Sequence, residues 1–422
     1  MSAKSPVFEF AEMPPAKRAM VLKKVIVVFL DVVDFDNWEA LFLLLKQHDE
    51  VHDEVHDEVH IVVTSRAFDA ELAPAKVDFR TKKVVVDRGG VKQPEVDTAT
   101  FFKDVKAKAD QPVNHADSRK LVQIHLEFMD KHLEKAGFTK YKLFNGGYAP
   151  EPGLTSDIHK LCHLFPNAEG TDFCTAAEYK AREAEWFEWT PAQRRTMFDS
   201  IPVTKEFPNV DGMVAKLRES DGPIAAWFLG PMTAAAHVLS HQDLRDRFEE
   251  AYVMGSCWDA TGKSNLLGVC FNYGVDMAAA LFVLAALSAN PNCRTLFVPT
   301  ETTKNAVVPT FCREAYLGEK VQSTMLREGR TFWNDIKGGP QPPYDAAACV
   351  PSGKFVEMGV VAKVEHAMNG AMALTEVAEP TAVEAWAAAK GFYAVKNPDT
   401  PEKCQAVKDA LVESFHALFA AF

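Results

Sequence analysis

The sequence lacks the features that mark several large protein classes. Its eight cysteines form no Cys-x-x-Cys pair, and no Cys/His cluster has zinc-site spacing, so reduced thiols are expected. No apolar run reaches the roughly 18 residues that a membrane span needs. Lys and Arg number 46 against 58 Asp and Glu, which gives a net charge of -12. We therefore expect no membrane partner and no nucleic-acid partner, because a broad nucleic-acid-binding face is basic.

The amino-terminal stretch, MSAKSPVFEFAEMPPAKR, has no apolar core of the kind found in secretory signals. Together with the dispersed cysteines, this predicts a cytoplasmic protein. The two prolines indicate a short irregular arm over residues 1–20. Because 47% of the 422 residues are hydrophobic, we expect a single large domain over residues 21–422. Residues 150–220, charged and rich in aromatic side chains, are predicted to be an insertion or lid.

Alternating strand and helix patterns predict the fold class. The apolar run 24–30 ends in Asp31 and indicates a strand buried on both faces, as in parallel sheets. Further strands are predicted at 59–64, 82–86 (edge-like), 140–144, 223–229, 251–255, 294–298 and near 355–365. Helices are predicted at 36–47, 97–110, 116–136, 174–188, 232–247, 275–288, 303–330 and 401–420. This order is typical of a doubly wound, mostly parallel α/β sheet with helices on both faces and helical insertions. Such folds bind ligands beyond the carboxyl ends of their strands.

A short repeat interrupts this pattern, because His-Asp-Glu-Val occurs three times between His48 and His60. On a continuous helix, the spacing of four would align His48, His52, His56 and His60 on one face, where they could bind a transition metal. The simpler interpretation, which we prefer, is a lengthened loop between a helix and the next strand.

Acidic residues gather where the first strand ends. Asp31, Asp34 and Asp36 fall within six residues, with Asn37 beside them. Crowded carboxylates repel one another unless a cation is present, and calcium is the hard cation that oxygen ligands favour. Alternatively, Asp34 or Asp36 caps the following helix and the other acids are solvated. The residues alone do not decide between these two interpretations.

Five blocks, in order, resemble the inosine-uridine nucleoside hydrolase family. The segment VVFLDVVDFDNWEALFLLL resembles its amino-terminal signature, Asp-x-Asp-x-x-x-Asp-Asp after a buried strand. Later blocks are similar to its Leu-Gly-Pro-Leu-Thr-Asn, Ala-Glu-Phe-Asn, Val-Pro-Leu-Asp-Val-Thr and His-Asp-Pro motifs. In this chain they are Ala226–Thr233, Gly268–Asp276, Phe297–Thr303 and Tyr344-Asp345. The resemblance covers roughly residues 24–365 and implies a nucleoside-hydrolase-like fold.

The resemblance also implies an activity and a site. Members of the family release a base from a nucleoside, by attack of calcium-activated water on C1′ of the ribose. Nucleoside salvage, with a nucleoside or related ribosyl compound as the partner, is the corresponding role. The calcium ligands would be Asp31, Asn37, Asp345 and the backbone carbonyl of Thr233. The ribose would contact Asp36, Ser264 or Asn265, Cys270 and Asn272. Family members are usually dimers or tetramers, so a homo-oligomer stays open.

Three departures from the family pattern bear on catalysis. Val33 stands where the family has the acid that removes the proton from water, which leaves Asp34 as the candidate base. Asn37 replaces a carboxylate with a neutral amide, and Cys270 replaces a glutamate that holds ribose. A working hydrolase with a remodelled cation site is therefore one hypothesis. The alternative is a non-catalytic relative that binds a ribosyl ligand or a protein through the same scaffold.

Two other features have competing interpretations. The sequence from Asp259 to Ser264 ends like a phosphate-binding loop, but Cys257 replaces the first glycine and no helix is expected at Lys263. We therefore do not expect a nucleoside triphosphatase. Trp38, Trp227 and Trp258 lie near predicted strand ends, where one could stack on a base, although buried tryptophans more often fill the core.

Overall fold

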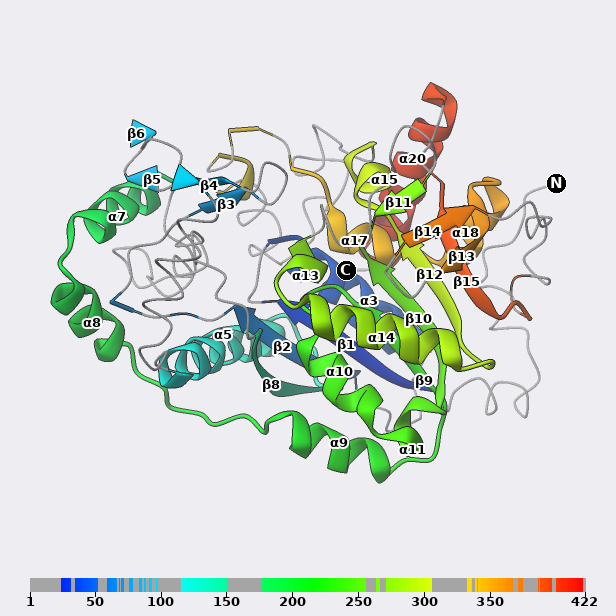
Figure 1. Cartoon of the computed structure of the whole chain (residues 1–422), viewed down its shortest axis with the longest axis horizontal. Coiled ribbons are helices and arrows are strands. Elements are labelled where there is room, and N and C mark those ends of the chain that lie inside the picture. Colours follow the sequence, from blue (N-terminus) through cyan, green and yellow to red (C-terminus); the bar gives the residue numbers. More distant parts are fainter. Residues whose placement is uncertain are drawn as a thin grey trace.

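The computed structural model places one large sheet at the centre of the chain (Figure 1). The residues described below are 24–31, 35–51, 59–66, 68, 70–71, 76–78, 83–85, 87–88, 91–92, 96–97, 115–149, 176–255, 263–265, 271–305, 332–335, 338–339, 341–366, 371–374, 386, 388–396 and 400–419.

The sheet has ten strands, and its order reverses at the first strand of the chain. From edge to edge, the order is β11 (Lys263–Asn265), β14 (Ala371–Leu374), β13 (Val361–His366), β15 (Gly391–Val395), β12 (Arg294–Val298), β10 (Phe248–Met254), β9 (Ile224–Phe228), β1 (Val25–Asp31), β2 (Val59–Arg66) and β8 (Tyr141–Ala149). The strands from β15 to β8 pair in parallel, whereas β13, β14 and β11 pair antiparallel. The predicted doubly wound, mostly parallel sheet is confirmed, and its switch point lies between β1 and β9.

Side chains of β1 alternate between two hydrophobic cores, because successive residues of a strand point to opposite faces. Val28 and Leu30 belong to one core, and Val27 and Phe29 belong to the other. The first core includes residues of α3 (Phe35–Val51), α5 (His115–Lys135), α17 (Tyr344–Ala348), α18 (Ser352–Glu357) and α20 (Pro401–Phe419). The second includes residues of α9 (Val210–Arg218), α10 (Thr233–Ser240), α11 (Gln242–Arg245), α13 (Phe271–Gly274) and α14 (Met277–Ala289). Helices therefore cover both faces of the sheet. A further short helix, α15 (Thr300–Asn305), contacts α17 and α20.

A smaller hydrophobic cluster attaches two helices beside α5. The helices are α7 (Ala176–Glu188) and α8 (Pro191–Ser200), which lie to the side of the sheet in Figure 1. Tyr179, Trp186 and Phe198 of this pair join Phe68 and residues of α5 in the cluster. The start of α8 is fixed by a capping box, in which Thr190 and Gln193 satisfy each other's backbone N–H groups.

Several element boundaries differ from those predicted. Residues 83–85, expected as an edge strand of the main sheet, form β4 (Lys83–Val85) in a separate sheet with β3 (Lys76–Asp78) and β7 (Val96–Asp97). Strands β5 (Asp87–Arg88) and β6 (Val91–Lys92) form a two-stranded sheet. The helix expected at 232–247 is interrupted at His241, whose extended backbone separates α10 from α11. The strand predicted near 355–365 begins only at Val361, after α18. The expected arm 1–20, residues 98–110 and most of 303–330 lie outside the described residues.

The His-Asp-Glu-Val repeat does not form one helical face. His48 lies near the end of α3 and is buried, whereas His60 lies in β2 and pairs with Val27 of β1. A helix and a strand cannot present these two side chains at helical spacing. His52 and His56 lie outside the described residues.

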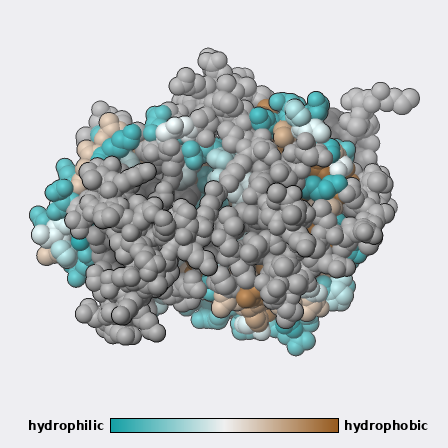
Figure 2. All heavy atoms as spheres, turned by 45° about the horizontal axis from the view of Figure 1, so that its top comes forward, coloured by the Kyte–Doolittle hydropathy of each residue, from teal (hydrophilic) through white to brown (hydrophobic). Residues whose placement is uncertain are grey.

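Figure 2 shows one face of the molecule, and the described residues on it are largely polar. On the face shown in Figure 2, hydrophilic residues dominate the coloured surface and hydrophobic ones form small patches. Val203 and Phe282 are the large hydrophobic side chains that stand exposed among the described residues. No helix in the described part of the chain is long and apolar enough to cross a membrane.

Candidate functional site

The candidate site is built at the carboxyl ends of β1 and β9, at the switch point of the sheet. Strand β1 ends at Asp31, whose side chain is 6% exposed. Beside it, the backbone N–H of Leu229 donates to the carbonyl of Phe29 (2.8 Å), which extends the pairing beyond β9. The backbone of Gly230 then lies directly against that of Leu30 and Asp31, where a Cβ atom would overlap both. Only glycine fits at this contact, so Gly230 sets how closely the two strand ends approach.

The first turn of α3, which follows β1, places further polar side chains near the carboxyl end of β1. Asp36 and Asn37 lie in the first turn of α3 and are 7% and 0% exposed. Asp36 is an acid in the first turn of a helix, where the helix dipole stabilises negative charge. Because α3 begins at Phe35, Asp36 lies inside the first turn and is not the N-cap residue of the helix.

Asn37 reaches a residue from the far end of the chain. Its Nδ2 donates a hydrogen bond of 2.5 Å to Oδ2 of Asp345, in the first turn of α17. Asp345 is 4% exposed, and α17 packs closely on α3. The structure thus brings together two of the residues that the resemblance placed in one cation site.

Asp345 also affects its neighbour one helical turn later. The Sγ atom of Cys349 donates to the backbone carbonyl of Asp345 (3.4 Å). Burial raises the pKa of the Cys349 thiol, and the negative charge of Asp345 raises it further. Cys349 is therefore a neutral thiol beside the backbone of Asp345, without thiolate character.

Thr233 and Asn272 come from elements on the other side of β1. Thr233 begins α10, and its Oγ1 donates to Oδ2 of Asp276 at 2.6 Å. Asn272, in α13, is 6% exposed, and its Nδ2 donates weakly to the carbonyl of Met254 (3.4 Å) at the end of β10. Thr233 therefore follows the carboxyl end of β9, and Asn272 contacts the carboxyl end of β10.

The remaining predicted site residues lie in β11 or outside the described residues. Ser264 and Asn265 lie in β11, an edge strand that pairs antiparallel with β14. Val33, Asp34 and Cys270 lie outside the described residues. Lys263 is also in β11, and a phosphate-binding loop would instead begin a helix at this lysine.

Of the three tryptophans considered as base-stacking residues, Trp38 packs inside the core and Trp227 packs partly buried against it. Trp38 is fully buried, with its ring edge-on to Phe42 and Phe128. Trp227 stacks on Tyr252 of the neighbouring strand, with 4.7 Å between ring centroids and 19° between planes. Core packing is thus the role of Trp38, while Trp258 lies outside the described residues.

The donor set partly fits a calcium ion. Carboxylate and amide oxygens are the ligands that calcium prefers, and Asn37 and Asp345 are close enough to contact one ion. Among the described residues, however, no group of three His, Cys, Asp or Glu side chains is arranged to hold a metal ion. Asn37 also directs its N–H group, and not its oxygen, at Asp345. A cation site would therefore need the amide turned over, together with backbone carbonyls or water.

Three residues near this edge were not singled out as site residues from sequence. Gly230 and Asp276 lie within matched blocks, but their contacts with Asp31 and Thr233 depend on tertiary structure. Asp276 precedes an apolar stretch, which is a recognisable N-cap signal for α14. Cys349 carries no such signal.

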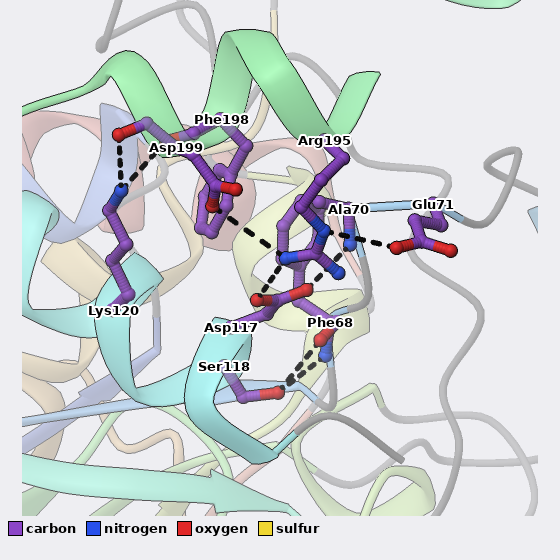
Figure 3. Close-up of polar contacts among 9 residues, drawn as sticks. All are labelled: Phe68, Ala70, Glu71, Asp117, Ser118, Lys120, Arg195, Phe198 and Asp199. Atoms are coloured by element: carbon purple, nitrogen blue, oxygen red, sulfur yellow. Dashed lines mark hydrogen bonds and ion pairs between the residues drawn. The ribbon is translucent and has the colours of Figure 1, made fainter. Parts of the chain in front are cut away.

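A second polar network lies between α5, α8 and the segment after β2 (Figure 3). Asp117 of α5 accepts hydrogen bonds from the Ala70 N–H (3.0 Å) and from Nη1 of Arg195 (2.6 Å). Oγ of Ser118 bonds both the N–H and the carbonyl of Phe68. Arg195 also contacts Glu71 (3.1 Å), and hydrogen bonding to Asp117 raises the pKa of Arg195. The network fixes the chain just beyond the carboxyl end of β2.

Comparisons with known proteins find similar folds only. No protein-family model matches the chain, and no curated protein matches its sequence. The chain is similar to an inosine-guanosine nucleoside hydrolase (13% identity, TM-score 0.47, 92% of this chain and 99% of that one). It is also similar to a purine-preferring ribonucleoside hydrolase from Gardnerella vaginalis (12% identity, TM-score 0.49, 93% and 100%). A third similar structure is the type III effector protein XopQ complexed with adenosine diphosphate ribose (13% identity, TM-score 0.46, 96% and 100%).

Proposed function

We propose that the chain hydrolyses the N-glycosidic bond of a ribonucleoside or a related ribosyl compound. The contact between Asn37 and Asp345 carries this proposal, because it joins two motif residues at the switch point of the sheet. Buried Asp31 and Asp36 lie at the same edge, where such folds bind ligands. A small polar ligand with several hydroxyl groups suits buried carboxylates and amides.

In this proposal, some residues bind the ribose and others activate the attacking water. Asp36 would accept a hydrogen bond from the ribose, and Asn272 would donate one to it. These two bonds would fix the orientation of the ribose. Asp34 would take the proton of the attacking water. Asp31, Asp345, the Asn37 oxygen and the Thr233 carbonyl would hold calcium, which makes bound water a better nucleophile by lowering its pKa. A cytoplasmic role in nucleoside salvage, and an insertion or lid over residues 150–220, are parts of the same proposal.

A second candidate function is binding of a ribosyl ligand without catalysis. The same hydrogen bond favours it, because an amide N–H satisfies the Asp345 carboxylate without a cation. Val33 favours it as well, since it replaces the family's proton-accepting acid.

The deciding experiment measures release of free base. The purified chain is incubated with purine and pyrimidine nucleosides and with ADP-ribose, in calcium or in chelator, and products are separated by chromatography. The proposal expects calcium-dependent release that Asp345→Asn abolishes and Asp243→Asn leaves unchanged, because Asp243 pairs with Arg218 on the surface. No release from any compound, with binding of one of them detected by calorimetry, would favour the second candidate.

A further inference from the structure

A buried carboxylate outside the proposed ligand set holds two helix starts together. Asp276 is 4% exposed and precedes α14. Its Oδ1 accepts the N–H of Ala279 (3.0 Å), which caps α14, and its Oδ2 accepts Oγ1 of Thr233 (2.6 Å). Both carboxylate oxygens therefore have a donor, one from each helix. Hydrogen bonds to an ionised group are stronger than those between neutral groups.

The chain between β9 and α10 is consequently fixed on two sides. On one side, Gly230 lies against the backbone of Asp31, and Leu229 is bonded to Phe29. On the other side, Thr233 is bonded to Asp276. Met232, at the N-cap of α10, supplies no side-chain hydrogen bond to that helix. In the described part of the chain, the hydrogen bond between Thr233 and Asp276 is therefore the polar side-chain contact that holds the turn formed by residues 229–233.

We propose that Asp276 is a positioning residue for the site, acting through Thr233. It fixes the backbone of residue 233, whose carbonyl the proposed cation site uses, without itself touching cation or ribose. The inference rests on the proposed function for its consequence in binding, but the fixing of the turn stands on geometry alone. An aspartate suits the task because its two oxygens accept one bond each, whereas asparagine offers one acceptor oxygen.

The test separates the hydroxyl of Thr233 from the cap of α14. Thr233→Val keeps the branched shape and removes the donor, and Thr233→Ser restores the donor. Asp276→Ser keeps one side-chain oxygen that can cap α14 and removes the second oxygen, which accepts from Thr233. Thr190→Val serves as the matched control, because Thr190 caps α8 through the Gln193 N–H (3.3 Å), and α8 packs in the separate cluster beside α5. Each variant is measured by hydrogen exchange of residues 229–236 and by calorimetric titration with calcium chloride.

We expect Thr233→Val and Asp276→Ser to exchange faster over residues 229–236 and to bind calcium about tenfold more weakly, the size typical of outer-shell changes. Thr233→Ser should restore both values to within about threefold, and Thr190→Val should change neither. Exchange in Thr233→Val that equals the wild-type rate would overturn the positioning role, whatever the calcium result. If the wild type binds no calcium while both variants exchange faster, the turn-fixing role is supported and the calcium part of the proposed function fails.

Discussion

Asn37 and Asp345 stand 308 positions apart in the sequence, yet the amide N–H of the first donates to the carboxylate of the second at 2.5 Å. Both side chains are buried. The amide of Asn37 thus occupies a position where a second carboxylate would repel that of Asp345.

Asn37→Asp should make the stability of the chain depend on calcium. Two buried carboxylates in contact repel strongly, so without a cation the free energy of unfolding should fall by about 3 kcal/mol. Millimolar calcium should recover most of this loss. Thermal unfolding in calcium and in chelator measures the effect. Asn209→Asp is the control, because aspartate and asparagine are equally good at an N-cap such as that of α9. A calcium-independent loss in Asn37→Asp would show that no cation enters here.

Gly230→Ala should damage both stability and ligand binding. The added methyl group would overlap the backbone of Leu30 and Asp31, and backbone cannot move aside as a flexible side chain can. We expect a loss of about 2 kcal/mol or more in the free energy of unfolding, typical of overpacking. Urea unfolding followed by circular dichroism measures it. A loss below about 0.5 kcal/mol, the usual range for surface changes, would contradict the close approach of the strands.

The two acids around Arg195 should differ in importance. The Asp117 side chain is 6% exposed and that of Glu71 is 53% exposed. Removing a buried partner of a charge is costly, so Asp117→Asn should lower the free energy of unfolding by about 2–3 kcal/mol. Glu71→Gln should cost less than about 1 kcal/mol, because exposed ion pairs are screened by water. Urea unfolding of both variants, and of each combined with Arg195→Lys, decides the ranking. Equal costs would contradict it.

Acid sensitivity should arise in part from Glu250, which lies between Lys24 (2.9 Å) and Arg294 (2.7 Å). Burial opposes ionisation of this carboxyl, but the two cations outweigh burial and lower the pKa of Glu250 below 4.5. The unfolded chain therefore takes up the proton first as the pH falls. The stability that this group contributes is complete well above pH 4.5 and is lost as the pH falls through its folded pKa.

Glu250→Gln should thus flatten the decline of stability between about pH 5 and pH 3, while lowering stability at neutral pH. Urea unfolding across this range measures both effects. Glu219→Gln is the control, because Glu219 is an exposed partner of Lys216 whose charge is screened. A profile for Glu250→Gln that parallels the wild type would contradict the linkage.

The sequence predicted the sheet well because buried parallel strands have a plain signature. The apolar run before Asp31 is such a strand. Its side chains pack into two hydrophobic cores, one on each face of the sheet, which explains why no residue in the run is polar. Which strands pair with each other is harder to predict from the sequence than where the strands lie. Residues 83–85 form a strand as expected, but local alternation does not reveal which sheet a strand joins. The repeat after His48 also shows that regular spacing predicts a helical face only where the helix continues.

Site residues were predictable as members of motifs, and their contacts were not. The resemblance assigned Asn37 and Asp345 to one site, but no local rule shows which atom of the amide meets the carboxylate. Asp276 is readable as a helix cap from the apolar stretch behind it. Its bond to Thr233, 43 residues earlier, depends on how α10 and α14 pack.

The span between Asn37 and Asp345 also bears on how the protein folds. Contacts between residues so distant close a very long loop, and that entropic cost delays them relative to local helices and hairpins. Strand β1 lies between strands from the two halves of the chain. The site at its carboxyl end is therefore complete only after both halves have docked. Any molecule that binds there recognises the finished chain and not a folding intermediate. Its binding energy would then add to the global stability of the protein.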